Sequence, residues 1–209
     1  MHYTSVENIH KVIDPLFMDE LEGEFETIQT YKTLNVKRKK LMDFQEKLAH
    51  LKFLDPACGS GNFLTETYLS LRRLENKVLR VLYGEGQGVL GVAASDIIKV
   101  SIQQFYGIEI NDFAVTVAKT ALWIAESQML DETKNIIYGL DGDFLPLKTY
   151  VNITEGNALR IDWNDVISAD ELNYIMGNPP FVGNSRLGDS QRAERSKLFD
   201  DRSGELDYV

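Results

Sequence analysis

The chain has 209 residues, with 22 lysines and arginines against 32 aspartates and glutamates, and a formal net charge of -10. Its single cysteine excludes a disulfide framework and a multi-cysteine zinc site, and its length allows a buried core without such staples. The composition, 44% hydrophobic and 26% charged, is that of a soluble globular domain. With no signal segment and no run of about 18–20 apolar residues to span a membrane, we expect a cytoplasmic protein.

The negative charge limits the partners of the chain. Stand-alone nucleic-acid binders usually carry a basic face, so this chain is not expected to hold DNA or RNA tightly by itself. It can still be one catalytic face of a larger binder. The dense basic run at residues 37–40 lies among helix-forming residues, and we interpret it as a solvent-exposed helix face.

The N-terminal quarter is predicted to be helical. Thr4 and Glu7 have the spacing of a capping box, in which each side chain bonds the other residue's backbone N–H. The helix that follows should be interrupted near Pro15 and resume over residues 16–28. A second amphipathic helix is predicted over residues 32–50.

The middle of the chain alternates between strands and helices. A short strand at residues 51–54 leads through a glycine-bearing turn into a helix over residues 63–83. The glycine-rich stretch at 84–91 is predicted to be a loop. A second strand at 105–110 precedes an apolar helix over 112–128.

Two further strands are expected near residues 151–154 and 172–176. The alternation predicts an α/β fold with a Rossmann-like, doubly wound, mainly parallel sheet. Because four strands are fewer than such a sheet usually has, we expect the chain to be truncated on its C-terminal side.

Three parts are predicted along the chain. They are an N-terminal helical segment at 1–50, an α/β core at 51–182, and the polar start of a truncated C-terminal segment at 183–209.

The first motif with chemical meaning spans residues 53–63, which read FLDPACGSGNF. Gly59 and Gly61 lack the Cβ atoms that would keep a ligand from backbone amides at a helix N-terminus. The motif lacks the Gly-Lys-Ser/Thr of a phosphate loop and the Gly-x-Gly-x-x-Gly spacing of a dinucleotide site. Asp55 at the strand tip suits a cationic ligand or an amino group. A tight turn without a ligand is the alternative.

The second motif, Asn178-Pro179-Pro180-Phe181, follows an apolar strand. The prolines donate no N–H, so nearby carbonyls and the Asn178 side chain should point away from the sheet. An amide and a carbonyl together offer two acceptors to an amino group, and Phe181 offers a flat face to a planar ring. The alternative is a strand-ending turn, for which Asn-Pro is a common signal.

Both motifs fall at the carboxyl ends of strands, where α/β proteins bind ligands. Together they resemble the bacterial N6-adenine-specific DNA methyltransferases that use S-adenosylmethionine. The flanking sequence resembles the methyltransferase part of large single-chain restriction–modification or phage-defence enzymes, over nearly the whole chain. The resemblance implies that residues 51–182 bind S-adenosylmethionine and methylate adenine in double-stranded DNA, without a metal.

The resemblance also implies roles for single residues. Tyr3 and Thr4 would touch the methionine end of the cofactor, and Asp55 would face its ammonium group. Glu109 would bind the ribose hydroxyls, with Ile110 beside the adenine.

Further positions follow from the same resemblance. The cofactor loop would also include Ala57, Gly59, Gly61, Asn62 and Phe63. Asn157 and Ala158 would border the cofactor adenine, and the catalytic set would be Asn178, Pro179, Pro180 and Phe181.

Two departures from the family pattern stand out. Glu109 lies much farther along the chain from Asp55 than the roughly 20 residues of simpler nucleotide-binding units, because a glycine-rich insert intervenes. Position 157 is Asn where Asp is usual in the family, so binding of the adenine should weaken there.

The family's chemistry assigns the catalytic loop a clear task. The Asn178 side chain and the Pro179 carbonyl would hold the N–H bonds of the target amine in line with the methyl group. The base would leave the duplex to reach them, and Phe181 would stack on it.

Other interpretations stay open. The target could be another planar amine or amide, such as N4 of cytosine, an RNA base or a protein glutamine. In a different class, the chain could be an inactive fragment that binds the cofactor or only folds. The histidines His2, His10 and His50 lack metal-ligand spacing, and Cys58 is interpreted as a packing residue of the cofactor loop. The DNA recognition sequence, a nuclease partner domain and the oligomeric state are not encoded in these motifs.

Overall fold

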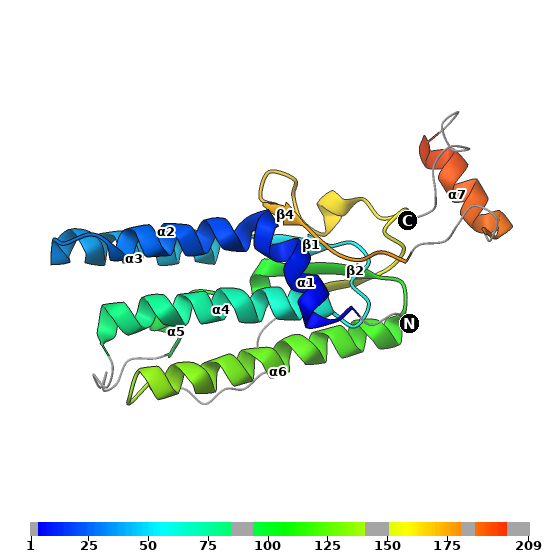
Figure 1. The fold of residues 1–209 in the computed structure, drawn as a ribbon. Coiled ribbons are helices and arrows are strands. Elements are labelled where there is room, and N and C mark those ends of the chain that lie inside the picture. The colour runs from blue at the N-terminus through cyan, green and yellow to red at the C-terminus, as the bar shows by residue number, and fades with distance from the viewer. Residues whose placement is uncertain (1–3, 85–93, 141–150, 181–186, 200–209) are drawn as a thin grey trace.

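A computed structural model describes residues 4–84, 94–140, 151–180 and 187–199. Its centre is a four-stranded sheet, all parallel, made of β1 (Phe53–Asp55), β2 (Phe105–Glu109), β3 (Asn152–Glu155) and β4 (Tyr174–Ile175) (Figure 1). The predicted parallel α/β class and all four predicted strands are confirmed.

The order of the strands in the sheet is β3-β2-β1-β4. The chain moves outward from β1 to β2 and β3, then returns to place β4 on the other side of β1. The sheet is therefore doubly wound, with its switch point between β1 and β4. Loops that leave the carboxyl ends of two strands diverge at such a point and open a crevice for ligands.

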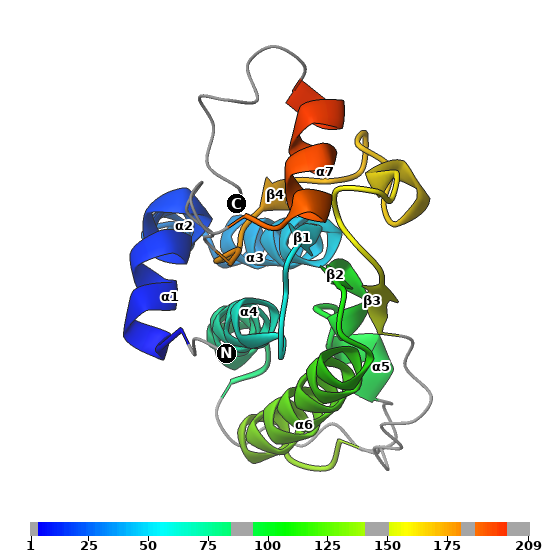
Figure 2. The same ribbon diagram turned by 90° about the vertical axis from the view of Figure 1, so that its right-hand side faces the viewer.

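Two long helices cover one face of the sheet (Figure 2). They are α4 (Asn62–Tyr83), which connects β1 to β2, and α6 (Asp112–Ile136), which leads from β2 towards β3. Helix α6 extends past its predicted end at residue 128, because Met129, Leu130 and Ile136 continue the buried face.

The opposite face of the sheet is covered by the segment that joins β3 to β4. Leu54 and Ile108 point to this side and pack with Ile167, next to Trp163 in the 3-10 turn η4 (Trp163–Asp165). The central strand β1 is thus buried on both faces, whereas the edge strands β3 and β4 are partly exposed.

The N-terminal helices confirm the predicted helical segment but differ in detail. Helix α1 (Val6–Ile13) continues through the π-helical turn η1 (Asp14–Met18) into α2 (Asp19–Gln29), so Pro15 loosens the helix without ending it. The helix cap is Ser5, whose Oγ accepts the Asn8 N–H at 3.4 Å. The predicted capping role of Thr4 was therefore wrong, and Thr4 lies just outside the helix.

Helix α3 (Leu34–His50) packs alongside α2 and leads into β1. The basic run at residues 37–40 lies on its first two turns and is largely exposed, as interpreted from the sequence.

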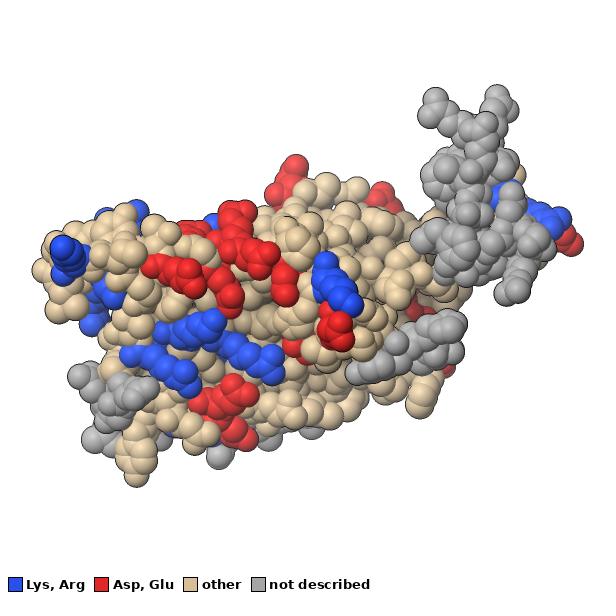
Figure 3. Space-filling view, in the orientation of Figure 1, with Lys and Arg blue, Asp and Glu red and all other residues tan. Residues whose placement is uncertain are grey.

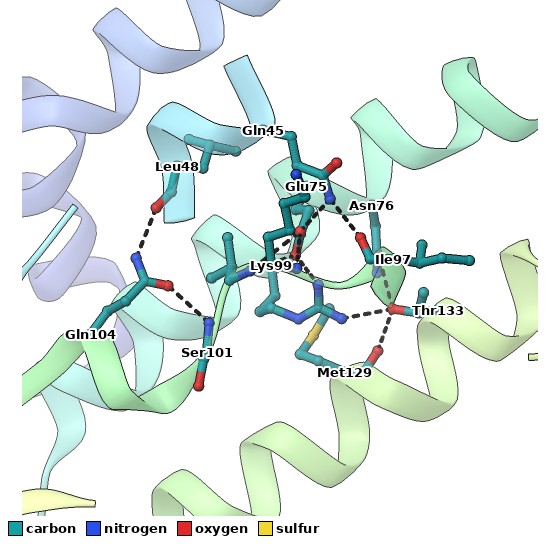
Figure 4. A network of polar contacts seen from close by, with 12 residues as sticks. Gln45, Leu48, Glu75, Asn76, Ile97, Lys99, Ser101, Gln104, Met129 and Thr133 are labelled. Atoms are coloured by element: carbon teal, nitrogen blue, oxygen red, sulfur yellow. Dashed lines mark hydrogen bonds and ion pairs between the residues drawn. The ribbon is translucent and has the colours of Figure 1, made fainter. Parts of the chain in front are cut away.

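A buried polar network joins α3, α4 and α6 (Figure 4). Arg72 and Glu75 of α4 form an ion pair with both side chains almost fully buried. Glu75 also accepts hydrogen bonds from Gln45 Nε2 and from the Lys99 N–H, each at 2.7 Å. Arg72 Nη2 donates to Thr133 Oγ1 of α6 at 2.8 Å. Both charges are thus compensated in the interior.

The remaining elements are short. They are α5 (Ala94–Ile97), the 3-10 turn η2 (Ile102–Gln104) and α7 (Asp189–Phe199), which lies in the predicted polar C-terminal segment. Most of the predicted loop at 84–91 lies outside the described residues. Over the ranges given above, no helix combines the length and apolar character that crossing a membrane requires.

Candidate active site

The two predicted motifs meet at the switch point of the sheet. Asp55 ends β1, and Gly177 follows β4. A Cβ atom at position 177 would overlap the Asp55 carboxyl group, so the glycine allows the two loops to touch. The motif around Asp55 and the motif that begins at Asn178 therefore form one site.

Asp55 is an acid in an unusual environment. Its side chain is buried, with the residue 2% exposed, and its Oδ1 accepts the Ala57 N–H at 3.0 Å. Burial raises the pKa of Asp55 to about 7, the Ala57 N–H opposes this, and the charge of Glu109 adds to it. A cation placed beside this carboxyl group would favour its ionised form.

The glycine loop is held against the end of β2. The Gly59 N–H donates to Glu109 Oε2 at 2.9 Å, and the Asn111 N–H donates to Glu109 Oε1 at 2.9 Å. These bonds fix the orientation of the Glu109 carboxylate. Because each carboxylate oxygen has two lone pairs, Glu109 keeps the capacity to accept from two hydroxyl groups.

Gly61 makes the turn into α4. It has φ +81°, and a Cβ atom there would lie 3.0 Å from the Cβ of Ala118 on α6. The left-handed conformation and the close approach both require glycine. Asn62 then begins α4, and Phe63 is buried behind the loop.

The ends of β2 and β3 bring a second group of predicted residues together. The Gly156 N–H donates to the Glu109 carbonyl at 2.8 Å, which places the turn at 157–160 beside Glu109. Ile110 is 68% exposed, as a residue that packs against a ligand ring would be.

Asn157 is engaged within the protein. Its Oδ1 accepts the Leu159 N–H at 2.9 Å, and its Nδ2 donates to Glu194 of α7 at 3.2 Å. The Ala158 carbonyl accepts from Trp163 Nε1 at 2.8 Å. The oxygen that the resemblance assigns to the cofactor adenine therefore already has a partner.

An open pocket of about 330 Å³ lies between α1 and the loop that begins at Asn178. Its lining consists of Thr4, Asn8, Val12, Phe63, Gly177 and Asn178. Across it, Asn178 Nδ2 donates to Thr4 Oγ1 at 3.1 Å. Residues far apart in the sequence thus form two walls of one cavity.

The structure brings most of the predicted residues to one edge of the sheet. Thr4, Asp55, Phe63 and Asn178 surround the pocket or lie against it, and Pro179 and Pro180 continue the loop from Asn178. Tyr3 and Phe181 lie outside the described residues.

The sequence interpretation missed Asn8 and Val12. They follow Thr4 at intervals of four residues, on one face of a helix, so their spacing could have revealed them.

Neither a metal cluster nor a nucleophilic thiol is evident among these residues. Within the described parts of the chain, no three His, Cys, Asp or Glu side chains lie close enough together to hold a metal ion. Cys58 is buried, and this burial raises the pKa of its thiol. Cys58 packs in the main core cluster beneath the glycine loop, as a packing residue would.

Comparisons with known proteins agree with this geometry. The family model described as MmeI, DNA-methyltransferase domain, matches residues 31–209. Over its full length the chain is 42% identical to DNA methyltransferase A of Bacillus subtilis (strain 168), of which it covers 23%. It also superposes, with TM-score 0.89, 43% identity and full coverage, on 27% of the Type IIL restriction-modification enzyme MmeI, solved in complex with DNA. The chain thus spans about a quarter of the length of these relatives.

Proposed function

The chain belongs to the MmeI DNA-methyltransferase domain family, and from this membership we propose that it transfers a methyl group from S-adenosylmethionine to N6 of adenine in double-stranded DNA. For the protein at its full length we propose a role in a restriction–modification or phage-defence system, as the names of its relatives suggest. Within the chain, residues 51–182 would form the S-adenosylmethionine-binding core. Residues 1–50 would form a helical segment whose start contacts the cofactor, and residues 183–209 would begin a further C-terminal segment.

The polar groups of the site fit S-adenosylmethionine. When bound, this cofactor supplies a methyl group activated on a sulfonium centre. The buried carboxyl group of Asp55 suits its ammonium group, and the fixed carboxylate of Glu109 suits a pair of ribose hydroxyls. The left-handed Gly61 and the amino end of α4 leave room for close approach of a ligand to the backbone.

One observation carries the proposal. The loop at Asp55, which would hold the cationic end of the cofactor, and the loop from Asn178, which would offer two acceptors, meet where Gly177 lies against the Asp55 carboxyl group. A methyl donor held by the first loop and an amine held by the second would therefore be neighbours. Well-oriented reactants of this kind can save about 7–11 kcal/mol of the barrier.

The hydrogen bond between Asn178 and Thr4 decides which atom of Asn178 serves the amine. Because Nδ2 donates to Thr4, Oδ1 is the atom left to accept an N–H of the target. The Pro179 carbonyl would accept the other N–H. Two acceptors stabilise the positive charge that develops on the nitrogen as it is methylated.

The catalytic loop lies at the surface, where a base rotated out of the duplex could reach it. Asn178 and Pro180 are exposed and Pro179 is half-buried. Extruding a base costs a few kcal/mol, and stacking on Phe181 would offset part of that cost.

The test uses the full-length protein, duplex DNA and S-adenosylmethionine labelled in its methyl group. Nucleosides from the digested product are separated and identified by mass spectrometry. We expect N6-methyladenine, and the label should be absent with Asp55→Ala, whose cofactor binding is followed by calorimetry. Label in N4-methylcytosine would replace adenine as the target, and label in RNA or in protein, tested in parallel reactions with those substrates, would replace DNA. Failure of the wild-type protein to bind the cofactor would refute the proposal.

A further inference from the structure

His10 on α1 bridges two carboxylates. Its Nδ1 lies 2.8 Å from Asp14 Oδ1, and its Nε2 lies 3.2 Å from Glu66 Oε1 on α4. The side chains of His10 and Glu66 are 34% and 11% exposed. A neutral imidazole carries one N–H and one lone pair, so only the protonated ring can donate to both carboxylates.

The other charged groups around the bridge do not replace it. On α4, Arg73 Nη1 lies 3.4 Å from the same Glu66 oxygen. On the exposed side of α1, Lys11 pairs with Glu7 at 2.9 Å. The hydrogen bond to Asp14 raises the pKa of His10 most strongly, partial burial opposes it, and Glu66 adds a further rise.

The bridge connects the two sides of the pocket. Helix α1 contributes Thr4, Asn8 and Val12 to its wall, and Glu66 lies one turn beyond the start of α4, which opens with the glycine loop. The buried side chains of Ile9 and Ile13 also hold α1, but apolar contacts are not directional. The bond from His10 Nε2 to Glu66 crosses from α1 to α4 and adds a directional contact between them, and the bond from Nδ1 to Asp14, in the same helical run, orients the imidazole ring.

We propose that protonated His10 is a positioning residue for methyl transfer, which joins α1 to Glu66 and so holds Thr4 at the distance from Asn178 that the reaction requires. This inference rests on the proposed function, because its effect is expressed through that site. His10 itself does not line the pocket.

The kinetic test compares wild type with His10→Asn in the full-length protein between pH 6 and pH 9. The ratio of the two kcat/KM values for S-adenosylmethionine cancels the titration of Asp55, which both proteins share. At pH 6 we expect the kcat/KM of wild type to exceed that of His10→Asn by about three- to tenfold, the range for a partly exposed charged hydrogen bond. At pH 9 the ratio should approach one. A ratio that does not change with pH, including a ratio of one at every pH, would overturn the proposal.

Glu66→Gln tests whether the bridge needs a protonated His10, because an amide at position 66 can bond to neutral His10. With an amide at position 66, a neutral His10 can donate to Asp14 from Nδ1 and accept from the amide at Nε2. This variant should match wild type at pH 6 and exceed it at pH 9. If its kcat/KM falls with rising pH as steeply as that of wild type, the bridge does not position the site.

The matched control is His50→Asn. His50 lies on α3 and contacts the Glu46 carbonyl at 2.7 Å, away from the pocket. Its kcat/KM should equal that of wild type at every pH.

Hydrogen exchange of the α1 amides provides a readout that needs no turnover. Protection factors over Val6–Ile13 should be lower in His10→Asn than in wild type at pH 6, and equal at pH 9. If wild type does not transfer methyl groups, the proposed function fails, and exchange still decides the bridge. Equal protection at pH 6 would refute the bridge even in an active enzyme.

Discussion

Asp55 is a site where function and stability oppose each other. Its folded-state pKa of about 7 lies above the ordinary value of 3.8, so between these values the folded state holds a proton that the unfolded state has released. Linkage then requires the free energy of unfolding to fall as pH rises from about 4 to 7. A site built for a cation has this property.

Replacing this carboxyl group with an amide should therefore stabilise the protein. We expect Asp55→Asn to raise the free energy of unfolding at pH 8 by about 2–4 kcal/mol, from a pKa shift worth 1.4 kcal/mol per unit, and to change it little at pH 4. Urea unfolding at several pH values measures this. Asp43→Asn, at an exposed position on α3, is the control and should show no such trend. An equal effect at pH 4 and pH 8 would contradict the prediction.

Asn178 should affect chemistry more than binding. Removing its acceptor with Asn178→Ala is expected to lower kcat by roughly 100- to 1,000-fold, the effect of losing one preorganised hydrogen bond in a transition state. Calorimetry should find the affinity for S-adenosylmethionine nearly unchanged. Asn35→Ala, on the exposed first turn of α3, serves as the control. Near-normal turnover by Asn178→Ala would remove the residue from the mechanism.

Where the glycine loop turns into α4, position 61 must be glycine, because its backbone is left-handed and it lies close to Ala118. Gly61→Ala would place a Cβ against Ala118 in a left-handed conformation, so it should destabilise the fold by about 1–3 kcal/mol. Gly23→Ala, within α2 with open space around it, should instead stabilise by about 0.5–1 kcal/mol. Thermal unfolding of both variants measures the difference. Equal effects of the two would mean that the packing against Ala118 is not as described.

The buried network of α3, α4 and α6 predicts a second effect at this scale. Glu75→Gln leaves the Arg72 charge uncompensated and should cost about 3–5 kcal/mol. Glu22→Gln, which breaks the exposed pair with Lys77, should cost less than about 1 kcal/mol. Chemical denaturation distinguishes the two, and a small cost for Glu75→Gln would show that water reaches Arg72.

Sequence patterns predicted the elements whose residues repeat regularly. The helix over α4 and the four strands followed from periodicity, and the two glycines and two prolines identified the loops that form the site. The cap of α1 was placed one residue early, because Thr4 and Ser5 both suit that position chemically. Thr4 instead contacts Asn178, a residue far away in the sequence.

Other features depend on tertiary contacts that no local pattern carries. Arg72 and Glu75 have the spacing of a solvent-exposed helix pair, and only the packing of α3 and α6 buries them. The sequence shows only that His10 lacks metal-ligand spacing, since its partner Glu66 lies on another helix.

Charge is distributed unevenly over the face of the molecule seen in Figure 3. Figure 3 shows acidic side chains gathered over α2, with basic side chains next to them. Two of these contacts are ion pairs between helices, Lys47 with Glu24 at 2.6 Å and Lys77 with Glu22 at 2.8 Å. Under the proposed function, lysines already paired with carboxylates are less suited to bind DNA phosphates, and we expect the duplex to approach from another side.

This arrangement predicts the salt dependence of DNA binding by the full-length protein. A lysine that contacts a phosphate contributes about one to the slope of log affinity against log salt. The double variant Lys47→Gln, Lys77→Gln should leave that slope unchanged within about 0.5, as measured by fluorescence anisotropy. A slope reduced by about two would place DNA on this face.

The burial of Cys58 has a practical consequence for spectroscopy. This thiol is the only one in the 209 residues, and its position in the interior and its raised pKa make it a poor target for maleimide reagents. Cysteines introduced at exposed positions, such as Lys11 on α1 and Arg73 on α4, would therefore take up spin labels selectively while Cys58 stays native. Double electron–electron resonance would then measure the distance between labels on α1 and α4, in solution and across a pH titration.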